Sequence, residues 1–232
     1  MNDSSIHDRL ENIVKRIQSA AIASGRDARS VKLVTVSKTR SADEVRAAAS
    51  AGALIFGENY VKEASEKIAL LQDLNRPFHL IGHLQSNKAK TAVRLFDLIH
   101  SVDSENLARE LDKQAQKIGK IQGILIQVNV GMEESKSGID EAGLEALVRA
   151  IHTLENIRVL GLMTIPPFDL DPEAARPYFR KLRLAADRIR YLDLPNIRMD
   201  ELSMGMTGDF ETAIEEGATL VRIGTAIFGE RS

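Results

Sequence analysis

The sequence predicts an α/β protein: one (β/α)8 TIM barrel that spans residues 1–232 as a single domain. Eight short apolar runs alternate with helix-like segments, and one such unit recurs about every 29 residues, close to the spacing of a barrel of this kind. An additional amphipathic segment, residues 6–17, precedes the first run and is expected to be an extra N-terminal helix packed against the barrel.

Each predicted strand is a short apolar run that ends near a glycine or a polar residue. Strands that alternate with helices form a parallel sheet through right-handed crossovers, and eight of them close into a barrel. An open doubly wound sheet is the main rival, but no Gly-x-Gly-x-x-Gly turn follows any run. The eight runs cover residues 32–37, 54–57, 78–82, 98–102, 123–130, 157–164, 201–203 and 219–224.

The segments between the runs carry apolar residues three and four apart, as on one face of a helix. Ser41 and Glu44 form a predicted capping box at one helix start. Thr207 is expected to cap a short helix that ends near Gly217. Examples of the apolar spacing are Leu107, Leu111 and Ile118 in one segment, and Leu144, Leu147, Val148 and Ile151 in another.

Composition narrows the function classes. The 31 Lys and Arg residues against 33 Asp and Glu residues give a net charge of −2, which argues against nucleic acid as a partner. No run approaches the roughly 20 apolar residues that span a bilayer, and the N-terminus lacks a signal-peptide pattern. The absence of cysteine removes disulfides and thiolate chemistry. We expect a cytoplasmic protein without a membrane partner.

Lys38 follows the first predicted strand, where the working residues of a barrel lie. Strand alternation puts Val34, Val36 and Lys38 on one face. If that face is the barrel interior, the amine enters a poorly hydrated cavity, and desolvation lowers its pKa toward a neutral nucleophile. The alternative is a strand-end lysine that reaches into water.

The loops after the last two strands, residues 203–209 and 222–229, combine glycines with hydroxyl groups. Glycine lets the backbone approach an anion, and loops at this place in the fold commonly bind phosphate, although plain turns have the same composition. Arg222 shares strand parity with Gly224, so it is expected to point into the barrel, where it needs a salt-bridge partner or a ligand. These features fit a phosphorylated aldehyde held as a Schiff base, either pyridoxal phosphate (PLP) or the substrate of a class I aldolase.

Other polar residues give weaker signals. Asn59 follows the second strand and is expected either to face a ligand ring or to cap a helix. His83 and Lys136 follow later strands and lie near the expected rim, where ordinary loop positions are equally compatible with them. None of the five histidines has metal-ligand spacing, so no metal site is predicted. The run Lys88, Lys90 and Arg94 is interpreted as one solvated helix face.

Five segments of this chain, in order, carry a family resemblance: VTVSKT, LIFGENYVKEASEK, FHLIGHLQSNK, LSMGMTGDFETAI and VRIGTAIFGER. Together they resemble the PLP homeostasis protein family over essentially the whole chain. That family is similar in fold to the N-terminal barrel domain of alanine racemase, a fold-type III PLP enzyme. The resemblance implies that PLP is the cofactor and that Lys38 carries it as a covalent internal aldimine.

The resemblance also implies the remaining cofactor contacts. Arg222 would face the pyridine nitrogen, Asn59 would lie beside the ring, and Val36 and Met163 would form its wall. The phosphate would be held by backbone and hydroxyl donors of Ser203, Met204, Gly205, Gly224 and Thr225.

The chain departs from racemases at three places. A Lys-Ala-Asn-Ala-Tyr motif is replaced by Lys38-Thr-Arg-Ser-Ala42, the histidine after the sixth strand is replaced within residues 162–165, and the catalytic β-domain is expected to be absent after Ser232. A two-base racemase needs a base on each face of the cofactor, and only Lys38 is a candidate. A charged Arg222 would also oppose protonation of the pyridine nitrogen.

The resulting expectation is a monomeric, non-catalytic PLP carrier that buffers or delivers the cofactor for vitamin B6 and amino-acid homeostasis, with apo-PLP enzymes as its recipients. The alternative is a monomeric PLP-dependent racemase or a related enzyme. A regulatory interaction protein whose partner senses PLP loading remains compatible with the same residues, and an aldolase is the least favoured of the four.

Overall fold

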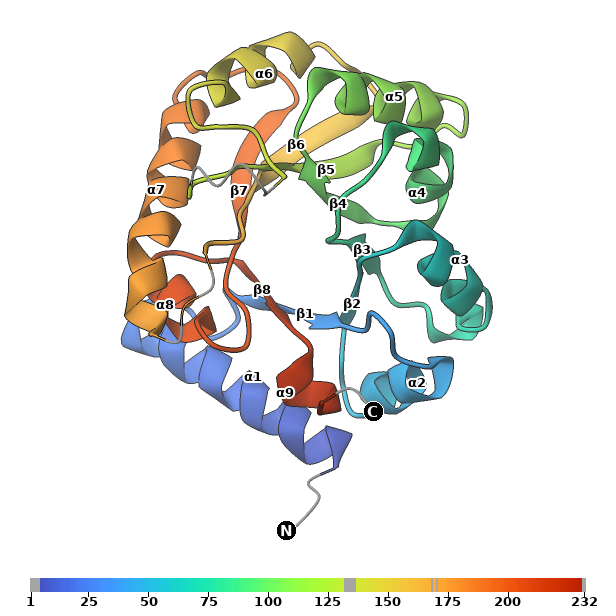
Figure 1. The fold of residues 1–232 in the computed structure, drawn as a ribbon, viewed down its shortest axis with the longest axis vertical. Coiled ribbons are helices and arrows are strands. Elements are labelled where there is room, and N and C mark those ends of the chain that lie inside the picture. The colour runs from blue at the N-terminus through green and yellow to red at the C-terminus, as the bar shows by residue number, and fades with distance from the viewer. Residues whose placement is uncertain (1–4, 132–136, 168, 170, 231–232) are drawn as a thin grey trace.

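The computed structural model describes residues 5–131, 137–167, 169 and 171–230. Its centre is a closed barrel of parallel strands in the order β1 to β8, with β8 paired back to β1 (Figure 1). The predicted (β/α)8 barrel is therefore confirmed. The strands are β1 (Lys32–Val36), β2 (Ile55–Glu58), β3 (Phe78–Leu80), β4 (Leu98–Val102), β5 (Gln122–Gln127), β6 (Ile157–Met163), β7 (Ile197–Ser203) and β8 (Leu220–Ile223).

The helices form a ring outside the strands (Figure 1). Two short 3₁₀ turns, Gln72–Leu74 and Ser86–Lys88, complete the connections. The helices are α1 (Ile6–Ala23), α2 (Ala42–Ser50), α3 (Val61–Ala69), α4 (Ala89–Leu95), α5 (Glu105–Gln116), α6 (Leu144–Ile151), α7 (Pro172–Arg190), α8 (Phe210–Glu215) and α9 (Thr225–Phe228).

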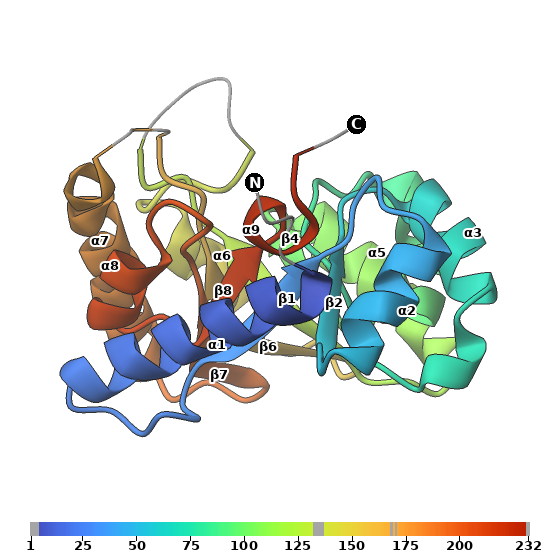
Figure 2. The same ribbon diagram turned by 90° about the horizontal axis from the view of Figure 1, so that it is seen from below.

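The extra N-terminal helix is also confirmed. Leu10, Ile13 and Ile17 are buried on one face of α1, which runs beside α8 and α9 (Figure 2). The Arg9 side chain donates a hydrogen bond of 2.6 Å to the carbonyl oxygen of Ile227 in α9. The helix therefore covers the elements that follow the last two strands, and it links them to the first.

Several predicted element boundaries were wrong. The β7 strand begins at Ile197, four positions before its predicted start, and Asp209 rather than Thr207 precedes α8. Ile118 lies beyond the end of α5 and is largely exposed, so it does not share the buried face of Leu107. The capping box of Ser41 is present, because its hydroxyl accepts from the Glu44 amide and the Glu44 carboxylate accepts in return.

The protein has two apolar cores, one inside the barrel and one outside it. The larger core lies between the strands and the helices, and it includes Phe56, Phe179 and Phe210. The smaller core fills the barrel itself with Val34, Val36, Ile81, Leu98, Leu125, Met163 and Leu220. Successive side chains along a strand alternate between the two cores, which fixes which residues can reach the barrel mouth.

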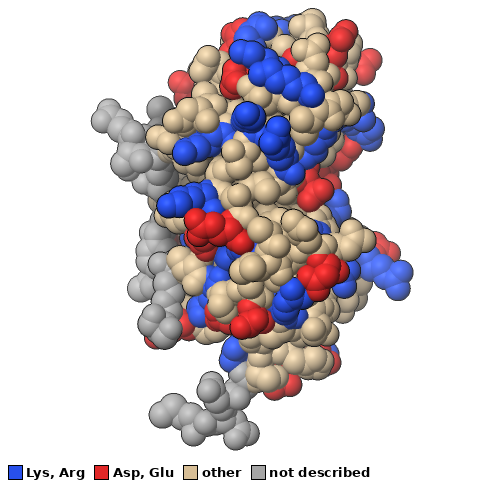
Figure 3. Space-filling view, turned by 90° about the vertical axis from the view of Figure 1, so that its right-hand side faces the viewer, with Lys and Arg blue, Asp and Glu red and all other residues tan. Residues whose placement is uncertain are grey.

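The surface is charged with both signs. Basic and acidic side chains both occur on the face shown in Figure 3. Lys88, Lys90 and Arg94 are exposed, as predicted for a solvated helix face. In the described part of the chain, none of the helices is both long enough and apolar enough to cross a bilayer.

Candidate functional site

A pocket of about 170 Å³ opens at the carboxyl ends of β1, β2 and β8. Its lining includes the cationic side chains of Lys38, Arg40 and Arg222, and no Asp or Glu lines it within the described residues. Such a pocket favours an anionic ligand, because a desolvated cation is costly unless a negative charge accompanies it. The lining residues are Val36, Lys38, Thr39, Arg40, Asn59, Ile81, Ile165, Met206, Thr207, Arg222, Gly224 and Thr225.

Lys38 lies at this pocket because of the alternation along β1. Val34 and Val36 both belong to the core inside the barrel, so the predicted inward face is the correct one. Lys38 is half-buried and contributes to the pocket wall. The structure therefore places a primary amine in the same pocket as the guanidinium groups of Arg40 and Arg222.

Arg222 points into the barrel, as the strand parity predicted. It is 4 % exposed. Its Nη1 donates to the Ser203 hydroxyl at 2.6 Å, and its Nη2 donates to the Thr164 carbonyl oxygen at 2.8 Å. Burial lowers the pKa of Arg222 to about 10, and the charge of Asp209 acts against that shift. Both of these hydrogen-bond acceptors are neutral, so neither neutralises the buried charge of Arg222.

The hydrogen-bond chain continues through two histidines inside the barrel. Nδ1 of His100 lies 2.9 Å from the Ser203 hydroxyl, and its Nε2 lies 3.0 Å from Nδ1 of His79. Burial lowers the pKa of His79 to about 4 and lowers that of His100 well below its ordinary value. The rings are neutral at pH 7 and therefore add no positive charge beside Arg222.

These two histidines were not predicted as functional residues, although strand parity indicates that they face the barrel interior. His79 shares parity with Ile81 on one strand, and His100 shares it with Leu98 on the next. Both apolar partners face the barrel interior. Reading the alternation along β3 and β4 would therefore have placed both rings inside the barrel.

Two further features of the pocket concern Asn59 and Gly224. The Asn59 side-chain oxygen is buried and has no hydrogen-bond partner among the described residues. A Cβ atom on Gly224 would lie 3.0 Å from the Val36 carbonyl oxygen and 3.2 Å from the Val36 Cβ. Glycine at position 224 therefore lets the backbone after β8 approach Val36 of β1 closely.

Four predicted site residues do not line this pocket. The Ser203 hydroxyl is engaged by Arg222 and His100, as described above. The Met204 side chain belongs to the core outside the barrel, and Met163 belongs to the core inside it. Gly205 is buried at φ +91°, and its carbonyl oxygen accepts from the Arg222 amide at 3.0 Å. The next residues of the same loop, 206–207, line the pocket instead.

A second cavity of about 300 Å³ adjoins the pocket and shares Asn59, Ile81 and Ile165 with it. His83 lies in this second cavity, at the rim where it was expected. Lys136 lies outside the described residues. Throughout the described ranges, no group of three or more His, Asp or Glu side chains could hold a metal ion.

A larger cavity, about 520 Å³, lies elsewhere, between the β5 loop and α6 and α7. Its lining has charges of both signs, including Asp140, Glu141 and Glu145 against Lys181 and Arg188. The Arg188 guanidinium pairs with the Glu141 carboxylate. This cavity lacks the excess positive charge of the pocket at the barrel mouth, so the smaller pocket is the better candidate site.

The barrel and this site define a class of protein. The chain matches the model of the family described as "Alanine racemase, N-terminal domain" over residues 8–232. Within that class, the chain belongs to the pyridoxal phosphate homeostasis protein family, because its relatives of that name align with it over nearly their whole length.

Three relatives illustrate the similarity. The pyridoxal phosphate homeostasis protein of Aquifex aeolicus is 46% identical, over 97% of each chain. That of Pseudomonas aeruginosa is 44% identical, over 98% of this chain and 96% of its own. PipY of Synechococcus elongatus, solved with PLP bound, is 39% identical with a TM-score of 0.83, over 97% of this chain and 100% of its own.

Proposed function

We propose that this protein binds PLP in the pocket at the barrel mouth, holds it covalently and reversibly at Lys38, and buffers or delivers it without robust catalysis of its own. One observation carries the proposal: a primary amine lines the same pocket as a buried guanidinium whose hydrogen-bond acceptors are neutral, and no Asp or Glu lines that pocket in the described chain. PLP has an aldehyde for the amine and a pyridine nitrogen that we propose Arg222 faces, and its anionic phosphate suits a pocket without acidic lining. The relatives named above support this ligand.

When bound, PLP supplies an aldehyde that condenses with a primary amine with loss of water. Lys38 is the amine that we propose for this linkage. Gly224 and Thr225 begin α9 at the pocket wall, and we propose that they meet the phosphate with backbone and hydroxyl donors. We propose that Asn59 donates or accepts at a ring substituent. We propose that Ser203, Met204 and Gly205 have a supporting role: they begin the loop after β7, residues 203–209, which we call the phosphate loop, and Ser203 and Gly205 accept hydrogen bonds from Arg222.

The carrier role is favoured over the racemase alternative by the lining of the pocket. Apart from Lys38, none of its described lining residues is a general base at neutral pH. His83 of the adjoining cavity is the residue that a two-base racemase would have to recruit. Incubation with single enantiomers of many amino acids decides between the two, because sustained racemisation would contradict the carrier role.

The proposal includes three finer expectations from the sequence: the protein is a monomer, it acts in the cytoplasm, and apo-PLP enzymes receive its cofactor. Light scattering on the PLP-loaded protein tests the first. Mixing loaded protein with an apo-PLP enzyme and measuring the recovered enzyme activity tests the third.

The covalent linkage is tested by absorbance and by reduction. Protein reconstituted with PLP is expected to absorb at about 420 nm, and borohydride should then fix the cofactor on the peptide that contains Lys38. Lys38→Ala is expected to abolish both signals. Lys32→Ala is the matched control, because Lys32 begins the same strand at its opposite end. An unchanged absorbance and an unchanged labelled peptide in Lys38→Ala would contradict the proposal.

A further inference from the structure

A buried ion cluster lies behind Lys38, between β2 and α3. Lys67 of α3 is only 6 % exposed. Its Nζ donates to the Glu58 carboxylate at 2.8 Å and to the Glu63 carboxylate at 2.9 Å. None of these three side chains lines the pocket at the barrel mouth. They therefore lie outside the lining of the proposed ligand site.

The cluster forms hydrogen bonds with the residues on both sides of Lys38. On one side, the Lys67 Nζ donates to the Ser37 carbonyl oxygen at 2.7 Å, and the Ser37 hydroxyl donates to the Glu58 carboxylate at 2.7 Å. On the other side, the Thr39 amide donates to the Glu63 carboxylate at 2.6 Å. The residues directly before and after Lys38 are thus fastened to the same three charged groups.

The segment that they fasten has an unfavourable backbone. Thr39 has a φ of +63°, in the left-handed region that β-branched residues strongly avoid. Such a conformation persists only when the surrounding contacts enforce it, and it is commonly found where a functional side chain must be aimed. The hydrogen bond from the Thr39 amide to Glu63 is one contact that enforces it here.

The cluster itself is also costly. Glu58 is fully buried, and its second carboxylate oxygen has no hydrogen-bond partner among the described residues. Burial raises the pKa of Glu58, with Lys67 acting against that shift. Because buried ion pairs give little net stability compared with apolar packing, an arrangement of this kind is better explained by a demand for defined geometry.

We propose that Lys67, Glu58 and Glu63 are positioning residues that hold the Ser37–Thr39 turn so that Lys38 projects into the pocket. This inference rests on the proposed function of Lys38. The role that we propose for the cluster is to set the direction of the amine, since no member of the cluster lines the pocket.

The test compares Glu63→Ala with Glu63→Gln. The side-chain amide introduced by Glu63→Gln would keep an oxygen that can accept from Thr39, whereas alanine would remove it. In cofactor-free protein, Glu63→Ala should accelerate hydrogen exchange of the Thr39 amide by about tenfold or more. In PLP-treated protein, it should reduce the fraction of PLP fixed on Lys38 by borohydride, also by about tenfold. Glu63→Gln should stay close to wild type in both measurements.

Two further variants keep the test decisive. Arg46→Ala breaks a neighbouring ion pair with Asp73 that does not touch residues 37–39, and it should change neither measurement. Thr39→Gly, added to Glu63→Ala, accepts the positive φ without strain and should restore the fixed fraction. The test uses Glu63 rather than Lys67, because Glu63 is partly exposed and its replacement is less disruptive to folding than that of the buried Lys67.

The inference is overturned if Glu63→Ala matches wild type in both measurements while Lys38→Ala abolishes borohydride fixation. If PLP is instead fixed equally well in Lys38→Ala, the proposed function fails. Hydrogen exchange of the Thr39 amide in the cofactor-free protein still tests whether the ion cluster holds the turn in that case, because that measurement does not depend on PLP.

Discussion

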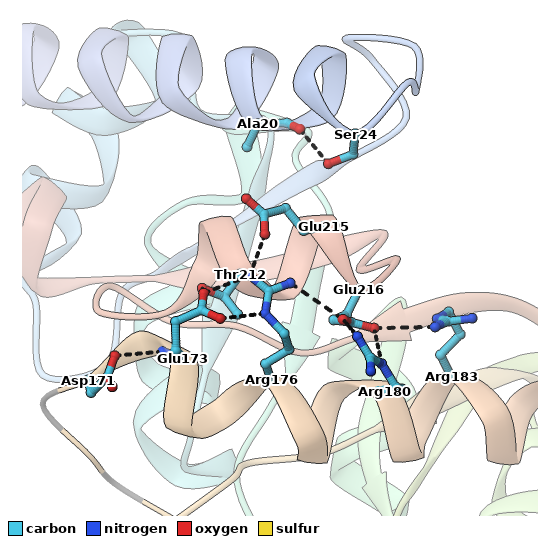
Figure 4. Close-up of polar contacts among 10 residues, drawn as sticks. All are labelled: Ala20, Ser24, Asp171, Glu173, Arg176, Arg180, Arg183, Thr212, Glu215 and Glu216. Atoms are coloured by element: carbon cyan, nitrogen blue, oxygen red, sulfur yellow. Dashed lines mark hydrogen bonds and ion pairs between the residues drawn. The ribbon is translucent and has the colours of Figure 1, made fainter.

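Two groups of arginines in this molecule differ in how their charge is compensated. Between α7 and α8, three arginines alternate with three glutamates at the surface (Figure 4). Inside the barrel, the hydrogen bonds described above join Arg222 only to neutral acceptors, a hydroxyl and a carbonyl oxygen. The surface arginines are Arg176, Arg180 and Arg183, and their partners are Glu173, Glu215 and Glu216.

The surface cluster is complete without a ligand. Glu216 is 5 % exposed and accepts from Arg180 at 2.7 Å, while Arg176 and Arg183 approach it at 3.4 and 3.3 Å. Each guanidinium there has a carboxylate partner, and the cluster fastens α8 to α7 (Figure 4). Arg222 lies in the opposite situation, since its buried charge lacks a carboxylate in hydrogen-bonding contact within the described chain. The comparison shows that carboxylates compensate the arginines between α7 and α8, whereas the buried Arg222 at the ligand site is hydrogen-bonded to neutral acceptors.

The largest expected effect is the loss of stability at acid pH that comes from His79 inside the barrel. The folded pKa of His79 is about 4, below its ordinary 6.5, so between these values the unfolded chain holds a proton that the folded chain does not. Stability contributed by the neutral ring is therefore present above pH 6.5 and is lost as the pH falls toward 4. The loss amounts to on the order of 3 kcal/mol.

Urea unfolding of wild type and His79→Asn between pH 7.5 and 4.5 measures this effect. We expect the stability advantage of wild type over the variant to shrink by on the order of 3 kcal/mol across that range. A constant difference between wild type and His79→Asn across that range would contradict the buried, neutral assignment of His79.

Replacing the uncompensated arginine should have the next largest effect. Arg222→Met removes the guanidinium that we propose faces the pyridine nitrogen of PLP, and we expect the affinity for PLP to fall by about 100-fold, since a hydrogen bond that involves a charged group contributes about 1.5–3 kcal/mol. Equilibrium dialysis measures the affinity. Arg180→Met removes a compensated surface arginine and should leave the affinity unchanged. Equal affinities for wild type and Arg222→Met would show that Arg222 is not part of the anion site.

Breaking the surface cluster should have the smallest effect. Glu216→Gln leaves three arginines with weakened compensation, and we expect the free energy of unfolding to fall by about 1–2 kcal/mol. Arg180 holds the pKa of Glu216 below its ordinary value of 4.5, so this stability is present above pH 4.5 and is lost as the pH falls through the lower folded value. Affinity for PLP should not change. A large loss of affinity would mean that α8 transmits strain into the phosphate loop.

The sequence predicted the fold and the inward residues well because both depend on local periodicity. The alternation Val34, Val36, Lys38 follows from strand geometry alone, and the same is true of Arg222 and Gly224. The start of β7 was missed because exposed Arg198 and Asp200 interrupt its apolar pattern.

The hydrogen-bond networks could not be predicted in the same way. The contact of Lys67 with Ser37 joins residues 30 positions apart, and that of His100 with Ser203 joins residues 103 positions apart. No period in the sequence encodes such pairs, because they arise only when separate strands and helices meet. The phosphate loop shows the same limit, since its composition was recognised but Met206 and Thr207 line the pocket rather than Met204.

The most direct measurement is the ratio of the dissociation constants of pyridoxal and PLP for the cofactor-free protein. The two ligands carry the same aldehyde and ring, and they differ in the phosphate. If the pocket that Lys38 and Arg222 line is an anion site, PLP should bind about 100-fold more tightly or better. Equal dissociation constants would contradict the assignment of this pocket as the site of a phosphorylated cofactor.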